Sequence, residues 1–514
     1  MIAKRPLAAT LCVLLMLFLH PSFSAADPDS GQQDGATNKP RVVVTISEET
    51  TRITEPLRED GYVNYVAALN EIASKGVTLE NNSAVLFWKA VGPSAIDQEY
   101  REEFFKPLGI APLPDEGEYF VDVNDDACDQ LEEVMKRPWS KREFPKLAKW
   151  LKANDVPLAI AVEATRRPKS FEPLYPEDSM LPATLLPGIE QRRVVARALC
   201  ARGMLRLGRG NIDEAWADVL ACHRLARLAG QGSTLINAAL ATNIERKACQ
   251  ADEAILQYKS LTAAQIAKIR ADLKALGPMP EVADFIGVCD RYMYLDFVAA
   301  IGRAGVSWIS ILSSDRESRT THEKLTDWAA RQSVDWNLIL RRGNSWYDRM
   351  EDAFHKPTYA ERREAAREVE KDMRELVNQT KGKTPLSIVF LSPSCEIASE
   401  RIGAMILGLL PPEPVLGMDA ENHAKMRFTL IELSFALAAY RADNGSYPAK
   451  LADLMPKYVD KMPEDIFIEK RLKYERKNNG YLLYSVGPNG VDDNGRRRED
   501  CDGDKWDDIA VEVK

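Results

Sequence analysis

The chemistry that the end of the chain could perform is cation binding by carboxylates. Five aspartates lie within nine residues: Asp500, Asp502, Asp504, Asp507 and Asp508. A calcium ion takes roughly six to eight oxygen ligands, and clustered carboxylates supply them. The first three alternate as at the start of an EF-hand loop, but Lys505 stands where that loop needs glycine, so an EF-hand is excluded. Two interpretations stay open: the aspartates hold calcium, or they form a solvated acidic loop.

Histidines, in contrast, show no spacing that indicates catalysis. Beyond residue 26 the chain carries His223, His322, His355 and His423. None belongs to an H-E-x-x-H motif, and the chain has neither a G-x-S-x-G motif nor a Walker-type loop. Carboxylates are numerous enough for acid–base chemistry, yet nothing in the sequence selects a pair. We therefore predict no catalytic residue and no organic cofactor. A non-catalytic scaffold that binds another protein is the main functional prediction, and a hydrolase with unrecognised carboxylate or histidine groups is the alternative.

The first 26 residues are typical of a secretory signal peptide. Lys4 and Arg5 precede an apolar run at 7–19, and residues 24–26 are small, as a cleavage site requires. The apolar run is shorter than the roughly 20 residues that a membrane-spanning helix needs. We expect an exported protein, periplasmic or extracellular, whose mature chain does not span a membrane. The alternative is a segment that is not cleaved and anchors the protein in the membrane.

The composition argues against a general nucleic-acid binder. The formal net charge is −9, whereas nucleic-acid binders present a basic footprint. Seven cysteines follow the signal segment at wide spacings, without a C-x-x-C pair. We expect most of them to be small buried residues and not a disulfide framework. Protein partners are the expectation, and the sequence does not indicate an oligomeric state.

Helical patterns dominate the body of the chain. The most regular one lies at 196–229, where two apolar-periodic stretches flank a turn at Gly210-Asn211. Gly203 and Ala215 are small where two antiparallel helices must approach closely. Together with Cys222, these positions resemble a tetratricopeptide repeat. A helical hairpin inside an α-helical domain is the alternative, since a lone repeat cannot bury its own face.

Residues 427–448 read RFTLIELSFALAAYRADNGSYP, and FTLIEL is similar to the start of a processed type IV pilin. Arg427 stands where the leader peptidase needs glycine. The stretch is also too short and too mixed in polarity for a filament stem, which needs about twenty apolar residues. We therefore predict an internal amphipathic helix with a buried stripe. The apolar segment before it, 396–419, is broken by prolines and is predicted to be a packed connector.

The second half of that stretch resembles the globular part of the major pseudopilin of type II secretion. The matching positions are Leu437, Tyr440, Asp443, Gly445, Tyr447, Pro448, Leu451 and Leu454. The resemblance implies a helix that ends at Gly445 and calcium bound in the loop before the final strand, with Asp508 in a matching position. Trp506 stands where the family prefers aspartate. Independently, Asn479-Gly480 predicts a hairpin, and alternating apolar residues at 507–513 predict a final strand.

These patterns predict a mainly α protein, in which a multi-helix N-terminal body precedes a small α+β pseudopilin-like domain. The helical remainder is similar to uncharacterised secreted bacterial proteins. The predicted order is a signal peptide at 1–26, a disordered linker at 27–40, a mostly helical region at 41–190, a helical domain with the hairpin at 191–395, the connector at 396–419 and the α+β domain at 420–514.

Overall fold

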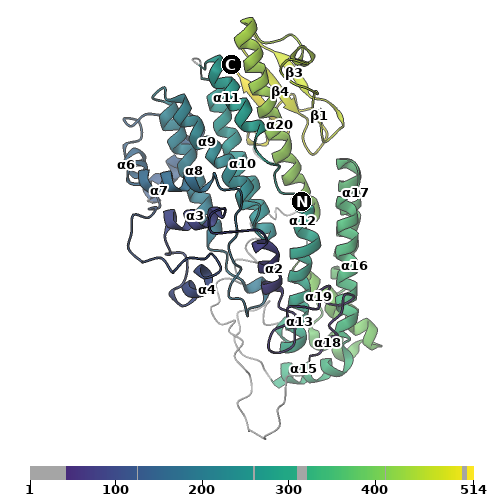
Figure 1. The fold of residues 1–514 in the computed structure, drawn as a ribbon. Helices are drawn as coiled ribbons and strands as arrows, with labels where there is room; N and C mark the ends of the chain where they lie inside the picture. Colours follow the sequence, from purple (N-terminus) through teal and green to yellow (C-terminus); the bar gives the residue numbers. More distant parts are fainter. Residues whose placement is uncertain (1–41, 124, 259–260, 310–320, 411–412, 501–505) are drawn as a thin grey trace.

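The computed structural model describes residues 42–123, 125–258, 261–309, 321–410, 413–500 and 506–514. These residues form a mainly helical molecule with a small antiparallel sheet near the C-terminus, shown in Figure 1. The predicted mainly α class with a small sheet region is thereby confirmed. The predicted signal peptide and linker lie outside the described residues.

Short helices build the first part of the body. They are α2 (Tyr65–Ser74), α3 (Ser83–Val91), α4 (Arg101–Phe105), α5 (Asp125–Val134), α6 (Pro145–Ala153) and α7 (Asp155–Ala164). Before them, the β-branched run at 42–46 forms no strand. Val43 N donates a hydrogen bond to the Tyr62 hydroxyl (3.0 Å), and Thr45 N donates to Asn337 Oδ1 (2.7 Å). Side chains thus satisfy backbone groups that a neighbouring strand would otherwise pair.

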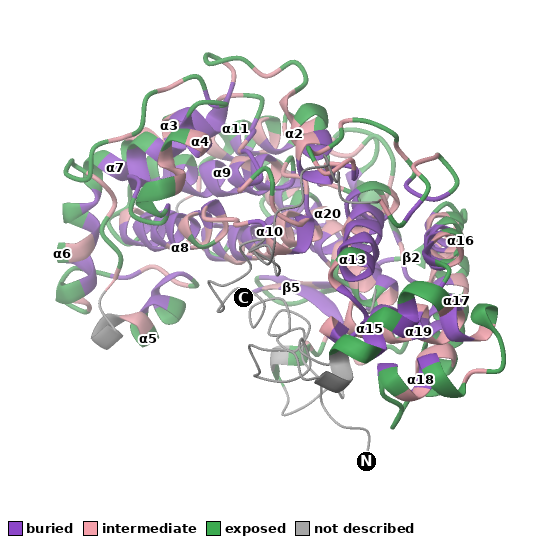
Figure 2. Ribbon diagram, turned by 90° about the horizontal axis from the view of Figure 1, so that it is seen from below, coloured by how far each residue is buried: buried purple, intermediate pink, exposed green. Residues whose placement is uncertain are grey.

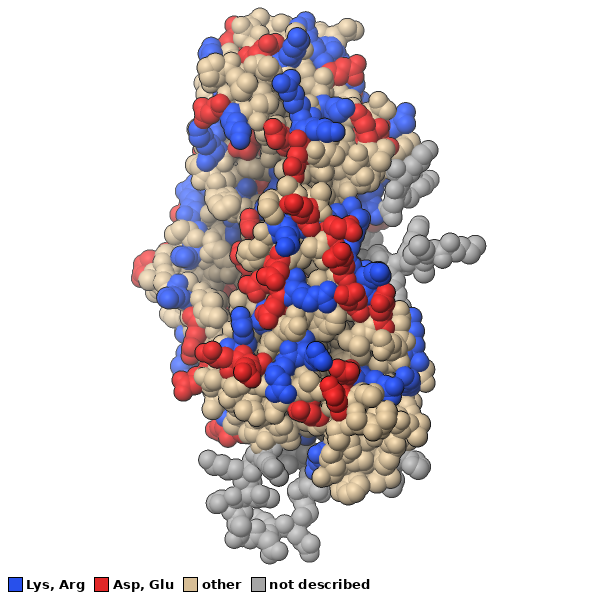
Figure 3. Space-filling view, turned by 90° about the vertical axis from the view of Figure 1, so that its right-hand side faces the viewer, with Lys and Arg blue, Asp and Glu red and all other residues tan. Residues whose placement is uncertain are grey.

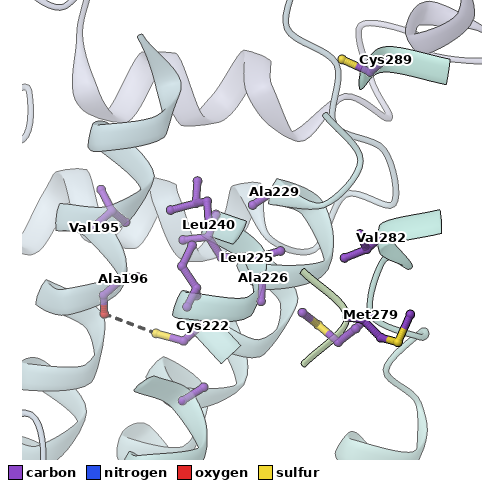
Figure 4. Packing of buried hydrophobic residues seen from close by; sticks show 14 of the residues in the cluster. Val195, Ala196, Cys222, Leu225, Ala226, Ala229, Leu240, Met279, Val282 and Cys289 are labelled. Atoms are coloured by element: carbon purple, nitrogen blue, oxygen red, sulfur yellow. Dashed lines mark hydrogen bonds between the residues drawn. The ribbon is translucent and has the colours of Figure 1, made fainter. Parts of the chain in front are cut away.

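The predicted helical hairpin consists of α8 (Gly188–Leu207) and α9 (Ile212–Ala229), and α10 (Leu235–Leu256) packs against both. Gly210 turns the chain with a φ of +82°. A Cβ added at Gly203 would lie 3.3 Å from the Ala215 carbonyl oxygen, so the small residue serves close packing. Figure 4 shows the core around Cys222, whose sulfur lies 3.5 Å from the Ala196 carbonyl oxygen. The hairpin is confirmed, and its relation to tetratricopeptide repeats stays a prediction.

The second part of the body contains helices of very different length. They are α11 (Ala263–Lys274), α12 (Val282–Phe285), α13 (Arg291–Ala304), α15 (Thr321–Ser333), α16 (Trp336–Phe354), α17 (Tyr359–Asn378), α18 (Pro385–Leu391) and α19 (Cys395–Leu409), with a π-helical turn at Ile286–Asp290. In Figure 1, α16 and α17 stand on one side of the molecule, and α15 and α18 lie at its lower end.

One helix, α20 (Pro414–Asn444), runs from the body into the C-terminal lobe. It packs on α10 and α11 and also on the sheet. The predicted connector is therefore helical in most of its described part, because the prolines separate α19 from α20 and Pro414 occupies the first helical position, which tolerates proline. The predicted boundary at 420 falls inside α20. The FTLIEL stretch is internal to this helix, and the buried Arg427 pairs with Glu253 of α10 at 2.6 Å.

The sheet consists of β3 (Lys473–Arg476), β4 (Tyr481–Ser485) and β5 (Ile509–Val513), antiparallel in that order, and a two-residue pair joins β1 (Glu464–Asp465) to β2 (Lys470–Arg471). The predicted hairpin and final strand are both present. Gly445 ends α20 with a φ of +79°, also as predicted. Tyr447 then folds back, and its ring meets that of Tyr481 edge-on, with centroids 4.8 Å apart.

Candidate metal centre

Among the described members of the predicted acidic group, the structure places Asp500 apart from Asp507 and Asp508. Asp507 and Asp508 lie directly before β5. Asp500 ends a short 3-10 turn and accepts a hydrogen bond from Arg497 N (2.8 Å), so its carboxylate closes that turn. Asp502 and Asp504 lie outside the described residues. Of the five, Asp507 and Asp508 are the described residues that belong to the cluster that follows.

A third aspartate, Asp493, completes a cluster with Asp507 and Asp508. One carboxylate oxygen from each of the three lies within 4.8 Å of the others. Sequence reasoning did not select Asp493, which precedes the acidic run and belongs to the other side of the loop. One sequence signal could have indicated Asp493: an Asp-Asn-Gly sequence favours a tight turn, and it occurs at Asp493-Asn494-Gly495. Asn494 and Gly495 both have positive φ, +60° and +76°.

Backbone donors hold two of the three carboxylates in place. Asp508 Oδ2 accepts from the backbone N–H groups of Asp493 (3.1 Å) and Gly495 (2.7 Å). Asp507 Oδ2 accepts from Asn489 N (3.0 Å). These bonds tie the strand-end aspartates to the loop that carries Asp493. Asp507 and Asp508 each use Oδ2 for these bonds, and their Oδ1 atoms have no hydrogen-bond partner among the described residues.

The remaining oxygens are buried and have no donor among the described residues. They are Asp493 Oδ2, Asp507 Oδ1 and Asp508 Oδ1. Asp508 is 2% exposed, so water cannot readily replace the missing partner. A buried oxygen without a partner costs free energy, and three that converge cost more because their charges repel. A bound cation would remove both costs.

Nearby cations are held by other groups. Lys473 pairs with Asp492 at 2.9 Å, and the Tyr484 hydroxyl donates to the same carboxylate. Arg363 lies close enough to lower the pKa of Asp507, but its guanidinium binds Asp419 at 2.9 Å. Among the described residues, no lysine or arginine forms an ion pair with the three clustered carboxylates.

The protonation equilibria reflect this environment. Burial, and to a smaller extent the charges of Asp493 and Asp492, raise the pKa of Asp508 to about 6, against the effect of its two backbone donors. Burial also raises the pKa of Asp507. Carboxylates with raised pKa values gain most from a divalent ion, because the ion stabilises the charged form that burial disfavours. A hard cation such as calcium suits an all-oxygen group, with backbone carbonyls and water as further ligands.

A second cluster lies in the core between α9 and α10. His223 is fully buried, with Nδ1 3.0 Å from Glu245 Oε2 and Nε2 2.9 Å from Asp252 Oδ2. Arg227 also binds Glu245. Burial by itself would lower the pKa of His223, but the two carboxylates raise it to about 10. At neutral pH His223 is thus a buried imidazolium that pairs with the carboxylates of Glu245 and Asp252. Its role is structural, because a substrate does not reach this group.

The other described histidines are placed differently. His355 is exposed at the end of α16, where Nδ1 lies 2.7 Å from the Glu351 carbonyl oxygen. His423 is half-buried on α20. Nothing is described of the His322 side chain. Another buried ionic group joins α8 to α9: Asp218 accepts from Arg202 (2.7 Å) and from Arg206 (2.7 Å).

Comparisons of the chain with protein-family models, with curated proteins and with solved structures find no match. Among the described residues, no helix combines the length and the apolar character that a membrane crossing requires. The pseudopilin-like and tetratricopeptide-like resemblances thus stay predictions drawn from the sequence.

Proposed function

We propose that this protein is an exported, non-catalytic scaffold whose C-terminal lobe binds calcium between Asp493, Asp507 and Asp508. The observation that carries the proposal is a group of three aspartates whose carboxylates lie within 4.8 Å of one another and which each have one buried oxygen without a donor among the described residues. Calcium at this point would join the loop of Asp493 to the start of β5. Its role would be to hold the lobe in shape and not to activate a substrate.

Several features support a binding role for the rest of the chain. The hairpin of α8 and α9, with α10 packed on it, is a stack of antiparallel helices of the kind that repeat proteins use to present surfaces to partners. The buried ionisable groups around His223 and Asp218 are engaged in ion pairs with neighbouring helices, His223 with α10 and Asp218 with α8. Turnover of any substrate by the purified protein in a pooled hydrolase screen would contradict the non-catalytic part of the proposal.

The calcium prediction is tested by thermal unfolding of the full chain. A fragment that begins at residue 420 would cut α20 and expose its contacts with α10 and α11, so it is not a suitable sample. Weak extracellular sites have dissociation constants of about 0.1–1 mM. At ten times that concentration, binding to the folded state alone adds about 1.4 kcal/mol. We expect several millimolar calcium to raise the melting temperature and magnesium to do less, because magnesium demands tighter octahedral geometry.

Two variants locate the site. Asp508→Asn keeps the shape of the side chain and removes the buried charge, so the calcium effect should vanish. Asp500→Asn is the matched control, because Asp500 belongs to the same acidic run but lies outside the cluster. Terbium, which replaces calcium, should show emission excited through the adjacent Trp506. An unchanged melting curve of the parent protein in calcium, or equal responses of the two variants, would show that the metal site is wrongly assigned.

A further inference from the structure

The lower end of the molecule in Figure 1, where α15 and α18 pack against each other, exposes large apolar side chains. Trp328 is 63% exposed, Leu391 78% and Phe390 50%, and Leu325 and Leu386 are also exposed. Figure 2 shows green, exposed surface on both helices. On the face drawn in Figure 3, charges of both signs are mixed over most of the surface, whereas a broad area at the lower end carries few. We call these five side chains the apolar end patch.

Local sequence explains why α18 is apolar on both sides. Thr384 caps the helix and Pro385 opens it, as expected for a helix start. Ile388 and Val389 are buried against the body, while Phe390 and Leu391 are directed away from it. A surface helix ordinarily turns polar residues outward. The outward apolar residues of α18 therefore have no role in the described core.

Basic side chains accompany the patch. Lys324 and Arg331 on α15, and Lys381 and Lys383 before α18, are exposed. None of the four has a carboxylate partner among the described residues. In the stretches 324–335 and 379–396, the exposed carboxylates among the described residues are Glu396 and Asp335, and Asp335 lies 3.8 Å from Arg341. This end is thus locally basic on a chain whose formal net charge is −9.

The described chain also begins near this end. Thr45 binds Asn337 at the start of α16, three residues after Val334. A Cβ built at Gly302 would lie 3.1 Å from Val43 and 3.0 Å from the Trp336 ring, so the segment at 42–45 lies against the junction that follows α15.

We propose that the apolar end patch docks on the surface of an anionic lipid bilayer. Tryptophan, phenylalanine and leucine partition into the headgroup region, and lysines beside them attract anionic lipids. A second copy of the chain fits less well. In a two-fold contact the same four cations would face each other across the interface, and like charges repel. The inference goes beyond the proposed scaffold function and does not depend on calcium.

Cys395 provides a probe of this surface. It is exposed and lies four residues after Leu391, whereas Cys200, Cys222, Cys249 and Cys289 are buried. A full chain with serine at positions 12, 128 and 501 can carry a polarity-sensitive fluorophore on Cys395. Vesicles of phosphatidylcholine with and without phosphatidylglycerol are then added. Tethering through residues 7–19 alone would leave the fluorophore in water, so its emission reports docking of the patch.

We expect a blue shift with phosphatidylglycerol vesicles that weakens as salt is added. The double variant Phe390→Glu and Leu391→Glu should lower the apparent affinity at least tenfold. Both side chains are exposed, so its circular dichroism should match that of the parent. Lys381→Glu with Lys383→Glu should also weaken binding. Val121→Glu is the control, since Val121 is exposed beside α6, where its carbonyl accepts from Trp150.

Three outcomes would overturn the proposal. The first is no shift with either kind of vesicle. The second is a shift that the Phe390 and Leu391 variant and the Val121 control retain equally. The third is a shift that appears without vesicles and grows with protein concentration, which would assign the patch to self-association or to a protein partner.

Discussion

Replacing His223 by glutamine should make the stability of the protein less dependent on pH. The folded-state pKa of His223 is about 10, against an ordinary value of 6.5. A raised pKa contributes stability that is fully present below pH 6.5 and is lost as the pH rises through 10. For this one group the contribution is about 4 kcal/mol at pH 7 and about 1.5 kcal/mol at pH 9. Glutamine has no proton to lose in this range and contributes no such slope.

The measurement is urea unfolding of the parent and of His223→Gln at both pH values. The variant should be less stable at pH 7, and the difference in unfolding free energy should shrink by about 2.5 kcal/mol at pH 9. His355→Gln serves as the control, because that side chain is exposed and contacts only a backbone carbonyl in the described contacts. If the stability difference for His223→Gln is the same at pH 7 and pH 9, His223 is neutral in the folded protein and the account of the buried cluster fails.

Two further predictions concern packing and charge in the core. Asp218→Ala should lower the unfolding free energy by about 3–5 kcal/mol, because Arg202 would keep a buried charge without a partner. Glu190→Ala, which breaks an exposed pair with Arg193 on the same helix, should cost less than about 1 kcal/mol, and equal losses would contradict the argument. Phe435→Ala should cost about 3–5 kcal/mol, since the ring is fully buried. Phe428→Ala should cost less, about 2 kcal/mol, because the ring of Phe428 is half-buried and lies under the guanidinium of Arg227. Denaturant midpoints of the two variants measure this order, and a larger loss for Phe428→Ala would refute the prediction.

Local signals predicted most of the C-terminal elements. Gly445 ends α20, Asn479-Gly480 closes the hairpin and alternating residues form β5, because each depends on the conformational preferences of a few neighbouring residues. The β-branched run at 42–46 has strand propensity, but the side chains of Tyr62 and Asn337 bind its backbone and no described strand pairs with it, so propensity alone does not determine this segment. The predicted boundary at 420 falls inside α20, because apolar periodicity continues through this helix without indicating which element each face covers.

The candidate site was predicted only in part. Of the predicted residues, Asp507 and Asp508 belong to an acidic cluster, whereas Asp500 closes its own turn and Asp493 was not selected; metal binding by this cluster stays a prediction. Membership depends on how the loop folds back, and spacing along the chain does not contain that information. The His223 cluster was invisible for the same reason. Its partners, Glu245 and Asp252, are 22 and 29 residues away on another helix.

The continuity of α20 has a consequence for how the molecule comes apart. Its 31 residues correspond to about 47 Å of uninterrupted helix, with the body on one part and the sheet on the other. Unfolding of the lobe would expose apolar surface of α20, and α10 and α11 pack on the same helix. The lobe and the body should therefore unfold as one cooperative unit. An ion that clamps the loop before β5 would then slow amide exchange not only in the lobe but far away in α10. A calcium site at one tip of the protein would thereby govern the lifetime of its whole core.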